Sequence, residues 1–209
     1  MKKRIFVIGP DGTGKTEIST WLAQRLGVGR FKVRTEKQNW HDGTFRSSLK
    51  FDELLPQFVF QTGAEFVSDR GYPCEWVYSQ VFGRQTSFEA LEKIDSDWAD
   101  MGAVHILCRK SDYSTARPDE LVPNDRLVEL DEKYLEFAEW TRCDTIVMDV
   151  DGFIIRDDRS RYGEHDTNGQ VEQVLRFLEA LRVKRSDREL LRAFVQVASS
   201  PDKERRRRR

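Results

Sequence analysis

The stretch that decides the fold lies near the N-terminus and reads Gly9-Pro10-Asp11-Gly12-Thr13-Gly14-Lys15-Thr16. It matches the phosphate-binding pattern G-x-x-x-x-G-K-[ST] at every fixed position. Its surroundings match as well. An apolar run at residues 5–8 predicts a buried strand before it, and apolar residues at helical spacing over 16–26 predict a helix after it. Because a chance glycine-rich turn rarely has both neighbours, the stretch predicts a nucleotide phosphate site.

Each fixed residue of this loop has a chemical role. Gly9, Gly12 and Gly14 allow backbone angles that turn amide N–H groups inward around a phosphate. The first turn of the following helix adds a partial positive charge at the same place. Lys15 reaches the β- and γ-phosphates of a nucleotide, and the Thr16 hydroxyl takes a place on Mg²⁺. We therefore predict ATP and Mg²⁺ as ligands, with a nucleotide site that lacks catalysis as the alternative.

Beyond the loop, short apolar runs alternate with longer amphipathic stretches. Further strands are predicted at residues 31–34, 65–69, 104–108 and 145–150. Helices are predicted at residues 44–62 with an interruption at Pro56, and at 74–82, 87–101, 127–138, 171–181 and 190–197. Residues 110–125 are polar and predict a loop. The alternation predicts an α/β domain whose five-stranded, mostly parallel sheet is covered by helices on both faces.

Charge divides the chain into an acidic body and a basic tail. The 209 residues carry a net charge of −1, yet residues 203–209 hold six cations and one anion. Residues 1–202 therefore carry a net charge of −6, which excludes a uniformly basic nucleic-acid-binding surface. We expect one domain over residues 1–202 and a basic, disordered tail over residues 203–209.

Other residue patterns exclude further classes. The three cysteines form no C-x-x-C pair and the three histidines are scattered, so neither a disulfide framework nor a structural zinc site is predicted. The apolar runs are too short for a membrane span, and residues 5–8 are too short for the core of a signal peptide. We expect a cytoplasmic protein without a membrane association.

Four stretches resemble the thymidylate kinase-like group of P-loop kinases. The phosphate loop has the form GxDGxGKT that is common in that group. Asp69-Arg70, after an apolar run, resembles the strand-terminal Asp-Arg of thymidylate kinases and the acid–arginine pair of deoxynucleoside kinases. Arg109 and Arg117 bracket a polar loop where the family has its mobile lid, and residues 130–137 resemble the helix before the last strand. The resemblance spans residues 4–180 and implies the three-layer P-loop sandwich with a short lid.

The resemblance and the geometry of parallel sheets together assign roles to these residues. Ligands collect at the carboxyl ends of parallel strands, where Asp69, Arg70 and Arg109 are expected. Asp69 would hold Mg²⁺ with Thr16 or accept the acceptor's proton, and Arg70 would bind an acceptor phosphate. Arg109 and Arg117 would neutralise charge during phosphoryl transfer, with Lys15. The alternatives are a strand-end pair that caps the next turn for Asp69-Arg70, and a solvated loop arginine for Arg117.

Glu36 is a further candidate, because deoxynucleoside kinases place a base glutamate and a tryptophan in this region. Glu36 would then be the general base and Trp40 a wall for the acceptor base, although the spacing differs from the family's. An exposed loop acid and a core-edge tryptophan are the alternative. Asp149 and Asp151 are expected to shape the loop around the nucleotide base.

The chain also departs from the family. It lacks the Pro-Gly-Gly-Thr run of thymidylate kinases, has Gly71 where an aromatic residue usually follows Asp-Arg, and has few lid arginines. These departures argue against dTMP itself as acceptor. We predict a Mg²⁺-requiring ATP phosphotransferase that acts on a deoxynucleoside monophosphate or a nucleoside, and we leave a homodimer open.

Two alternatives remain at this level. Some phages encode thymidylate kinase-like proteins that phosphorylate hydroxymethylpyrimidines such as 5-hydroxymethyluracil within DNA. The run from Arg205 to Arg209 would serve such a substrate as a DNA-binding arm, and the target base would be flipped out. A solubilising terminus is the simpler interpretation of that run. The other alternative is a nucleotide-dependent regulatory module that hydrolyses ATP slowly.

Overall fold

A computed structural model describes residues 2–33, 46–114, 122–151 and 174–180. The chain divides into two compact units, residues 2–170 and residues 171–209 with Met1. The described part of the second unit is a helix at residues 174–180, whose buried side chains include Val174 and Leu178. Every element named below belongs to the first unit.

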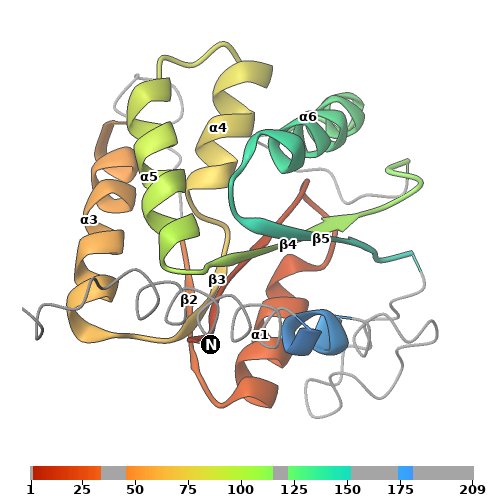
Figure 1. Ribbon diagram of the computed structural model, residues 1–209. Coiled ribbons are helices and arrows are strands. Elements are labelled where there is room, and N and C mark those ends of the chain that lie inside the picture. Colours follow the sequence, from red (N-terminus) through yellow and green to blue (C-terminus); the bar gives the residue numbers. More distant parts are fainter. Residues whose placement is uncertain (1, 34–45, 115–121, 152–173, 181–209) are drawn as a thin grey trace, which may run out of the picture. The chain divides into compact units, whose positions relative to one another are not determined.

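A parallel sheet forms the centre of this unit (Figure 1). Its strands are β1 (Arg4–Ile8), β2 (Gly29–Lys32), β3 (Phe66–Asp69), β4 (Val104–Arg109) and β5 (Asp144–Asp149). They lie in the order β2-β3-β1-β4-β5, and each neighbouring pair in the described part of the chain is parallel. All five residues of β1 are buried, as expected for the central strand of a sheet covered on both faces.

Helices cover both faces of the sheet (Figure 1). Helix α1 (Lys15–Leu26) lies on one face, and α3 (Arg46–Thr62), α4 (Tyr72–Val81), α5 (Phe88–Asp100) and α6 (Leu127–Trp140) lie on the other. A short 3₁₀ turn, η1 (Asn124–Arg126), precedes α6. This arrangement confirms the predicted α/β class and its three layers. No helix among the described residues is long and apolar enough to cross a membrane.

Phe6 of β1 is at the centre of the core between the sheet and the larger helix layer. Its ring makes edge-on contacts with Phe66, Tyr72 and Trp98 at centroid distances of 5.1–5.8 Å. Edge-to-face aromatic pairs of this kind stabilise a core beyond the area that they bury. They join β1, β3 and the helices α4 and α5 in one packed core cluster.

Two of the predicted elements differ from those observed. The second strand is β2 at Gly29–Lys32, two residues before the predicted 31–34, because its partner β3 sets the register from Gly29 opposite Phe66 to Lys32 opposite Asp69. As an edge strand with half-exposed side chains, β2 lacks a clear apolar pattern. Helix α3 runs without interruption through Pro56, although proline removes one helical hydrogen bond. The helix predicted at residues 190–197 and the tail lie outside the described residues.

The sheet brings the predicted site residues to one edge. Because its strands are parallel, their carboxyl ends lie together, and Val7 is level with Asp69 while Ile8 is level with Leu107. The phosphate loop leaves β1 there, Asp69 ends β3, and Arg109 ends β4. This is the edge at which ligands bind in open α/β sheets.

Candidate active site

The phosphate loop has the backbone that its glycines predict. Gly9, Gly12 and Gly14 have φ angles of 136°, 79° and 70°, a region that residues with a side chain rarely adopt. At Gly9 the loop also passes close to β4, because a Cβ atom there would lie 2.1 Å from the carbonyl oxygen of Cys108. Gly14 caps α1, so the N-terminal end of that helix faces the loop.

Lys15 is buried within the loop, with 5% of its surface exposed. Its ammonium donates to the carbonyl of Pro10 and to Thr13 Oγ1, and its nearest carboxylate oxygen, on Asp11, is 3.9 Å away. Burial, reinforced by the charge of Arg70, lowers the pKa of Lys15 from its ordinary 10.5 to about 8. An incompletely compensated cation in a loop of inward-facing amides has the chemistry of a phosphate receptor.

Thr16 and Asp69 form the predicted metal-binding pair. The Thr16 hydroxyl donates to Asp69 Oδ2 over 2.7 Å. Asp69 is fully buried, and its other oxygen, Oδ1, has no hydrogen-bond partner among the described residues. A hydroxyl and an unsatisfied carboxylate oxygen suit Mg²⁺, which binds proteins through one or two oxygen ligands and the substrate's phosphates. In the described ranges no cluster of three or more His, Cys, Asp or Glu side chains is arranged to hold a metal. The fit is therefore to Mg²⁺ that arrives with a nucleotide.

Two cations of β2 that were not predicted as site residues also reach this pair. Arg30 Nη2 lies 2.8 Å from Asp69 Oδ2, and Lys32 Nζ lies 3.1 Å from Thr16 Oγ1 and 3.4 Å from Asp69 Oδ2. Their spacing of two residues places both on one face of a strand. That spacing was the available signal, but it gains meaning only once β2 is known to pair with β3.

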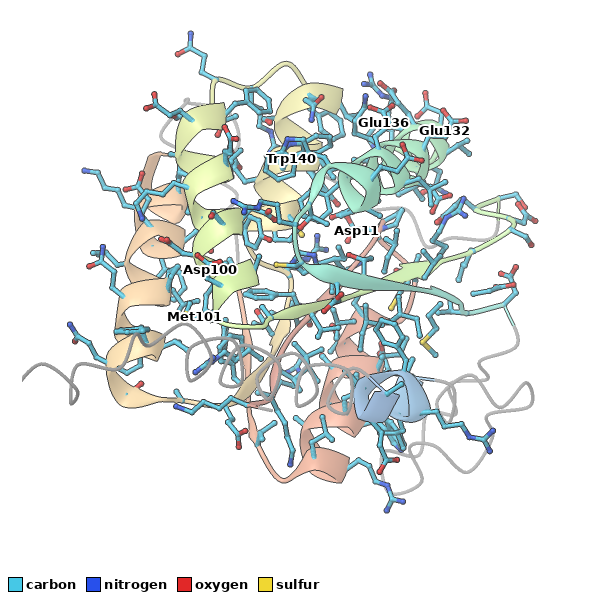
Figure 2. All side chains as sticks on the ribbon, viewed as in Figure 1. Asp11, Asp100, Met101, Glu132, Glu136 and Trp140 are labelled. Atoms are coloured by element: carbon cyan, nitrogen blue, oxygen red, sulfur yellow. The ribbon has the colours of Figure 1, made fainter. Side chains whose placement is uncertain are left out.

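Arg70 follows Asp69 in a left-handed conformation, with φ 74°. Its guanidinium donates to Asp11 and to Tyr78 of α4, while the Tyr78 hydroxyl donates to Asp11 Oδ2 over 2.9 Å. Asp11 is labelled in Figure 2. Burial would raise the pKa of Asp11, but Arg70, Lys15 and the Tyr78 hydroxyl together lower it. A non-glycine residue held at positive φ costs free energy and often marks a functional position.

Arg109 lies at the end of β4 as predicted, but it is paired with Asp131, an acid that was not predicted as a site residue. Its Nε is 3.0 Å from Asp131 Oδ2 and its Nη2 is 2.5 Å from the same atom. The hydroxyl of Tyr113 donates to Asp131 Oδ1 over 2.8 Å. The hydrogen bonds to Asp131 raise the pKa of Arg109, so its charge is permanent. The pair links the carboxyl end of β4 to α6.

Asp149 and Asp151 connect the ends of β4 and β5. Asp151 Oδ2 accepts from the amide of Ser111 over 2.8 Å, and Asp149 Oδ1 accepts from the amide of Asp151 over 2.9 Å. Both acids therefore shape loop backbone in this structure. The other candidates, Glu36, Trp40 and Arg117, lie outside the described residues, so their roles stay predictions.

The sheet order, the phosphate loop after β1 and the acid–arginine pair after β3 are those of a P-loop kinase fold. Solved structures share this fold. The YorR protein of Bacillus subtilis, determined with phosphorylated GDP, is 15% identical with a TM-score of 0.60, over 86% of this chain and 98% of its own. Deoxyadenosine kinase of M. mycoides with bound dATP is 17% identical with a TM-score of 0.53, over 84% and 99%.

A third similar structure is thymidylate kinase from Ehrlichia chaffeensis, 15% identical with a TM-score of 0.52, over 85% of this chain and 98% of its own. No protein-family model and no curated protein matches the sequence. At these identities the structural likeness establishes the fold, and it confirms the resemblance to nucleotide and nucleoside kinases at that level.

Proposed function

We propose that this protein is a Mg²⁺-requiring ATP phosphotransferase whose acceptor is a nucleoside or a deoxynucleoside monophosphate. The observation that carries the proposal is the meeting of Lys15, the Thr16–Asp69 pair and Arg70 at one edge of the sheet. The similar structures support it, because they include a deoxyadenosine kinase, a thymidylate kinase and a protein determined with a phosphorylated guanine nucleotide. A kinase that depends on cytosolic ATP would work in the cytoplasm.

The proposed reaction is divided among these residues as follows. The loop amides and Lys15 bind the β- and γ-phosphates, while Thr16 and Asp69 would hold Mg²⁺. When bound, Mg²⁺ supplies charge that offsets the phosphate oxygens. An acceptor oxygen attacks the γ-phosphorus, and the bond to the β,γ-bridging oxygen breaks with its electron pair leaving on ADP. Arg70 is proposed to bind the acceptor, and Arg109 and Arg117 are proposed to offset charge during transfer.

An acceptor hydroxyl also loses a proton, and two carboxylates are candidates to take it. Asp69 is a candidate in place of its metal-binding role, because Oδ1 has no partner among the described residues, whereas Oδ2 already accepts hydrogen bonds from Thr16 and Arg30. Glu36 is the other candidate, by its resemblance to the base of deoxynucleoside kinases. If the acceptor is a monophosphate, its phosphate oxygen attacks already ionised and needs no base.

The test is transfer from γ-labelled ATP to a panel of nucleosides, deoxynucleoside monophosphates, oligonucleotides with 5′-hydroxyl ends and hydroxymethylated DNA. The proposal predicts a labelled nucleotide product and ADP release that depends on the acceptor. Label in hydroxymethylated DNA would instead establish the DNA kinase alternative. A slow rate of ADP release that is the same with and without each acceptor would establish the slow hydrolase. Lys15→Met serves as the inactive control, because it removes the ammonium and keeps the length of the side chain.

A further inference from the structure

The cations of β2 differ in how firmly they are held. Arg30 bonds Ser19 Oγ of α1 through Nε and Asp69 Oδ2 through Nη2, both over 2.8 Å. Two hydrogen bonds from one planar guanidinium to two elements fix that side chain in place. Lys32 is the last residue of β2 and has a flexible stem, with 35% of its side chain exposed. Arg30 is thus a fixed neighbour of Asp69, while Lys32 is free to change partners.

The ammonium of Lys32 contacts both members of the metal-binding pair. It lies 3.1 Å from Thr16 Oγ1 and 3.4 Å from Asp69 Oδ2. With Arg30 fixed, these contacts leave Asp69 facing two cations before any metal arrives. A divalent cation that binds Thr16 and Asp69 would come within a few ångströms of Lys32, and like charges at that distance repel strongly beside a buried site. The metal ion and the Lys32 ammonium therefore cannot both contact Thr16 and Asp69 at the same time.

We propose that Lys32 is a displaceable cation of this site. Its ammonium holds Thr16 and Asp69 in the nucleotide-free protein, and turns to the phosphate oxygens when metal and nucleotide bind. The inference rests on the proposed function, since it needs a metal–nucleotide complex as ligand. It makes Lys32, on β2, a further phosphate-binding residue beside Lys15 of α1. It also makes the site a poor receptor for free metal, because Lys32 already neutralises Asp69.

The first test measures metal alone and needs no activity. Mn²⁺ is titrated into the full-length, nucleotide-free protein, and free Mn²⁺ is followed by electron paramagnetic resonance. Lys32→Met removes the competing charge and should bind Mn²⁺ at least about tenfold more tightly than wild type. Lys93→Met is the matched control, because Lys93 lies on α5 with 70% of its side chain exposed and pairs with Asp97. Equal occupancy in Lys32→Met and wild type, including none in both, overturns the proposal.

The second test measures the phosphate contact. With saturating Mg²⁺·ATP and acceptor, Lys32→Met should lower kcat about tenfold or more, as expected for loss of a charge-assisted contact to phosphate. Lys32→Arg, which keeps the positive charge, should keep most of the wild-type kcat. Unchanged kcat in Lys32→Met overturns the phosphate contact. Lys32→Gln repeats both measurements should the methionine variant melt below wild type.

The two proposals fail separately. Should the wild type transfer phosphate to no acceptor, the proposed function fails, whatever Mn²⁺ does. Should the wild type transfer phosphate normally while Lys32→Met matches it in both Mn²⁺ binding and kcat, the proposal for Lys32 fails and the kinase assignment stands.

Discussion

Burial of the Lys15 ammonium destabilises the folded, nucleotide-free protein. Burial lowers its pKa to about 8 from an ordinary 10.5, so the folded protein holds this proton less tightly than the unfolded chain. Below pH 8 both states are protonated, and the full penalty of burying the charge is present. Between pH 8 and 10.5 folding releases the proton, so stability from this group rises with pH. The folded protein thus carries an unfavourable buried charge that a bound phosphate would offset.

Lys15→Met should therefore make the nucleotide-free protein more stable while it abolishes transfer. We expect a gain on the order of 2–3 kcal/mol at pH 7, which shrinks as the pH rises from 8 toward 10.5. Urea unfolding at pH 7 and at pH 9.5 measures both values, with Lys93→Met as the exposed control. A variant less stable than wild type at pH 7 would show that the Lys15 ammonium stabilises the empty loop.

Gly9 and Gly27 allow steric crowding to be separated from backbone strain. Both have positive φ, 136° and 66°, but a Cβ at Gly9 would meet Cys108 at 2.1 Å, whereas a Cβ at Gly27 has no atom within 4 Å. Gly27→Ala should cost about 1 kcal/mol, the price of a left-handed alanine. Gly9→Ala should cost about 3 kcal/mol or more, because β1 and β4 must also separate. Chemical denaturation of both variants checks the order, and equal losses would contradict the crowding argument.

At the scale of elements, α3 brings a buried acid against α4. Asp52 is 4% exposed, and burial together with the charge of Glu75 on α4 raises its pKa to about 8. Since the unfolded chain releases this proton near its ordinary 3.8, the folded chain binds more protons between these values. Stability from Asp52 is therefore fully present below pH 3.8 and falls as the pH rises toward 8.

Asp52→Asn removes this titration and keeps the shape of the side chain. The variant should match wild type near pH 4 and exceed its free energy of unfolding by on the order of 2–4 kcal/mol at pH 8. Glu53→Gln is the matched control, because Glu53 is the next residue of α3 and is exposed. Urea titrations from pH 4 to pH 8 follow the difference. A constant offset across that range would mean that Asp52 ionises normally in the folded protein.

The same scale shows what the sequence can predict. The conformation of residues 9–16 depends on local backbone preferences, so the phosphate loop, the strand before it and the helix after it could all be predicted. Asp69 and Arg109 also end their strands as expected. Register is not local. The edge strand β2 was placed two residues late, so Lys32 was not aligned with Asp69 and its contact with Thr16 was missed. The contacts of Asp131 with Arg109 and of Tyr78 with Asp11 were not predicted for a similar reason, because 22 and 67 residues separate the partners in the sequence.

At the scale of the whole chain, the sheet edge concentrates positive charge within an acidic protein. Arg30, Lys32, Arg70 and Lys15 converge on two carboxylates there, although residues 1–202 carry a net charge of −6. Small phosphorylated acceptors are drawn by such a local field. A nucleic acid is repelled by the body as a whole, so a DNA substrate would need the basic residues 203–209, which lie outside the described residues.

Removal of residues 203–209 should therefore test whether this run is a DNA-binding arm. If the acceptor lies in DNA, the truncated protein should lose most of its affinity for duplex DNA at 50 mM salt. The loss should shrink at 200 mM salt, because each phosphate contact releases counterions and about four or five contacts dominate the salt slope. Fluorescence anisotropy measures both affinities, and a variant with Arg205 to Arg209 replaced by glutamine keeps the chain length as a control.

Transfer to a free nucleotide should be unaffected by either change, since the phosphate loop and Arg70 lie within residues 2–170. Unchanged DNA affinity in both variants would contradict a DNA-binding arm and support the solubilising interpretation of this run.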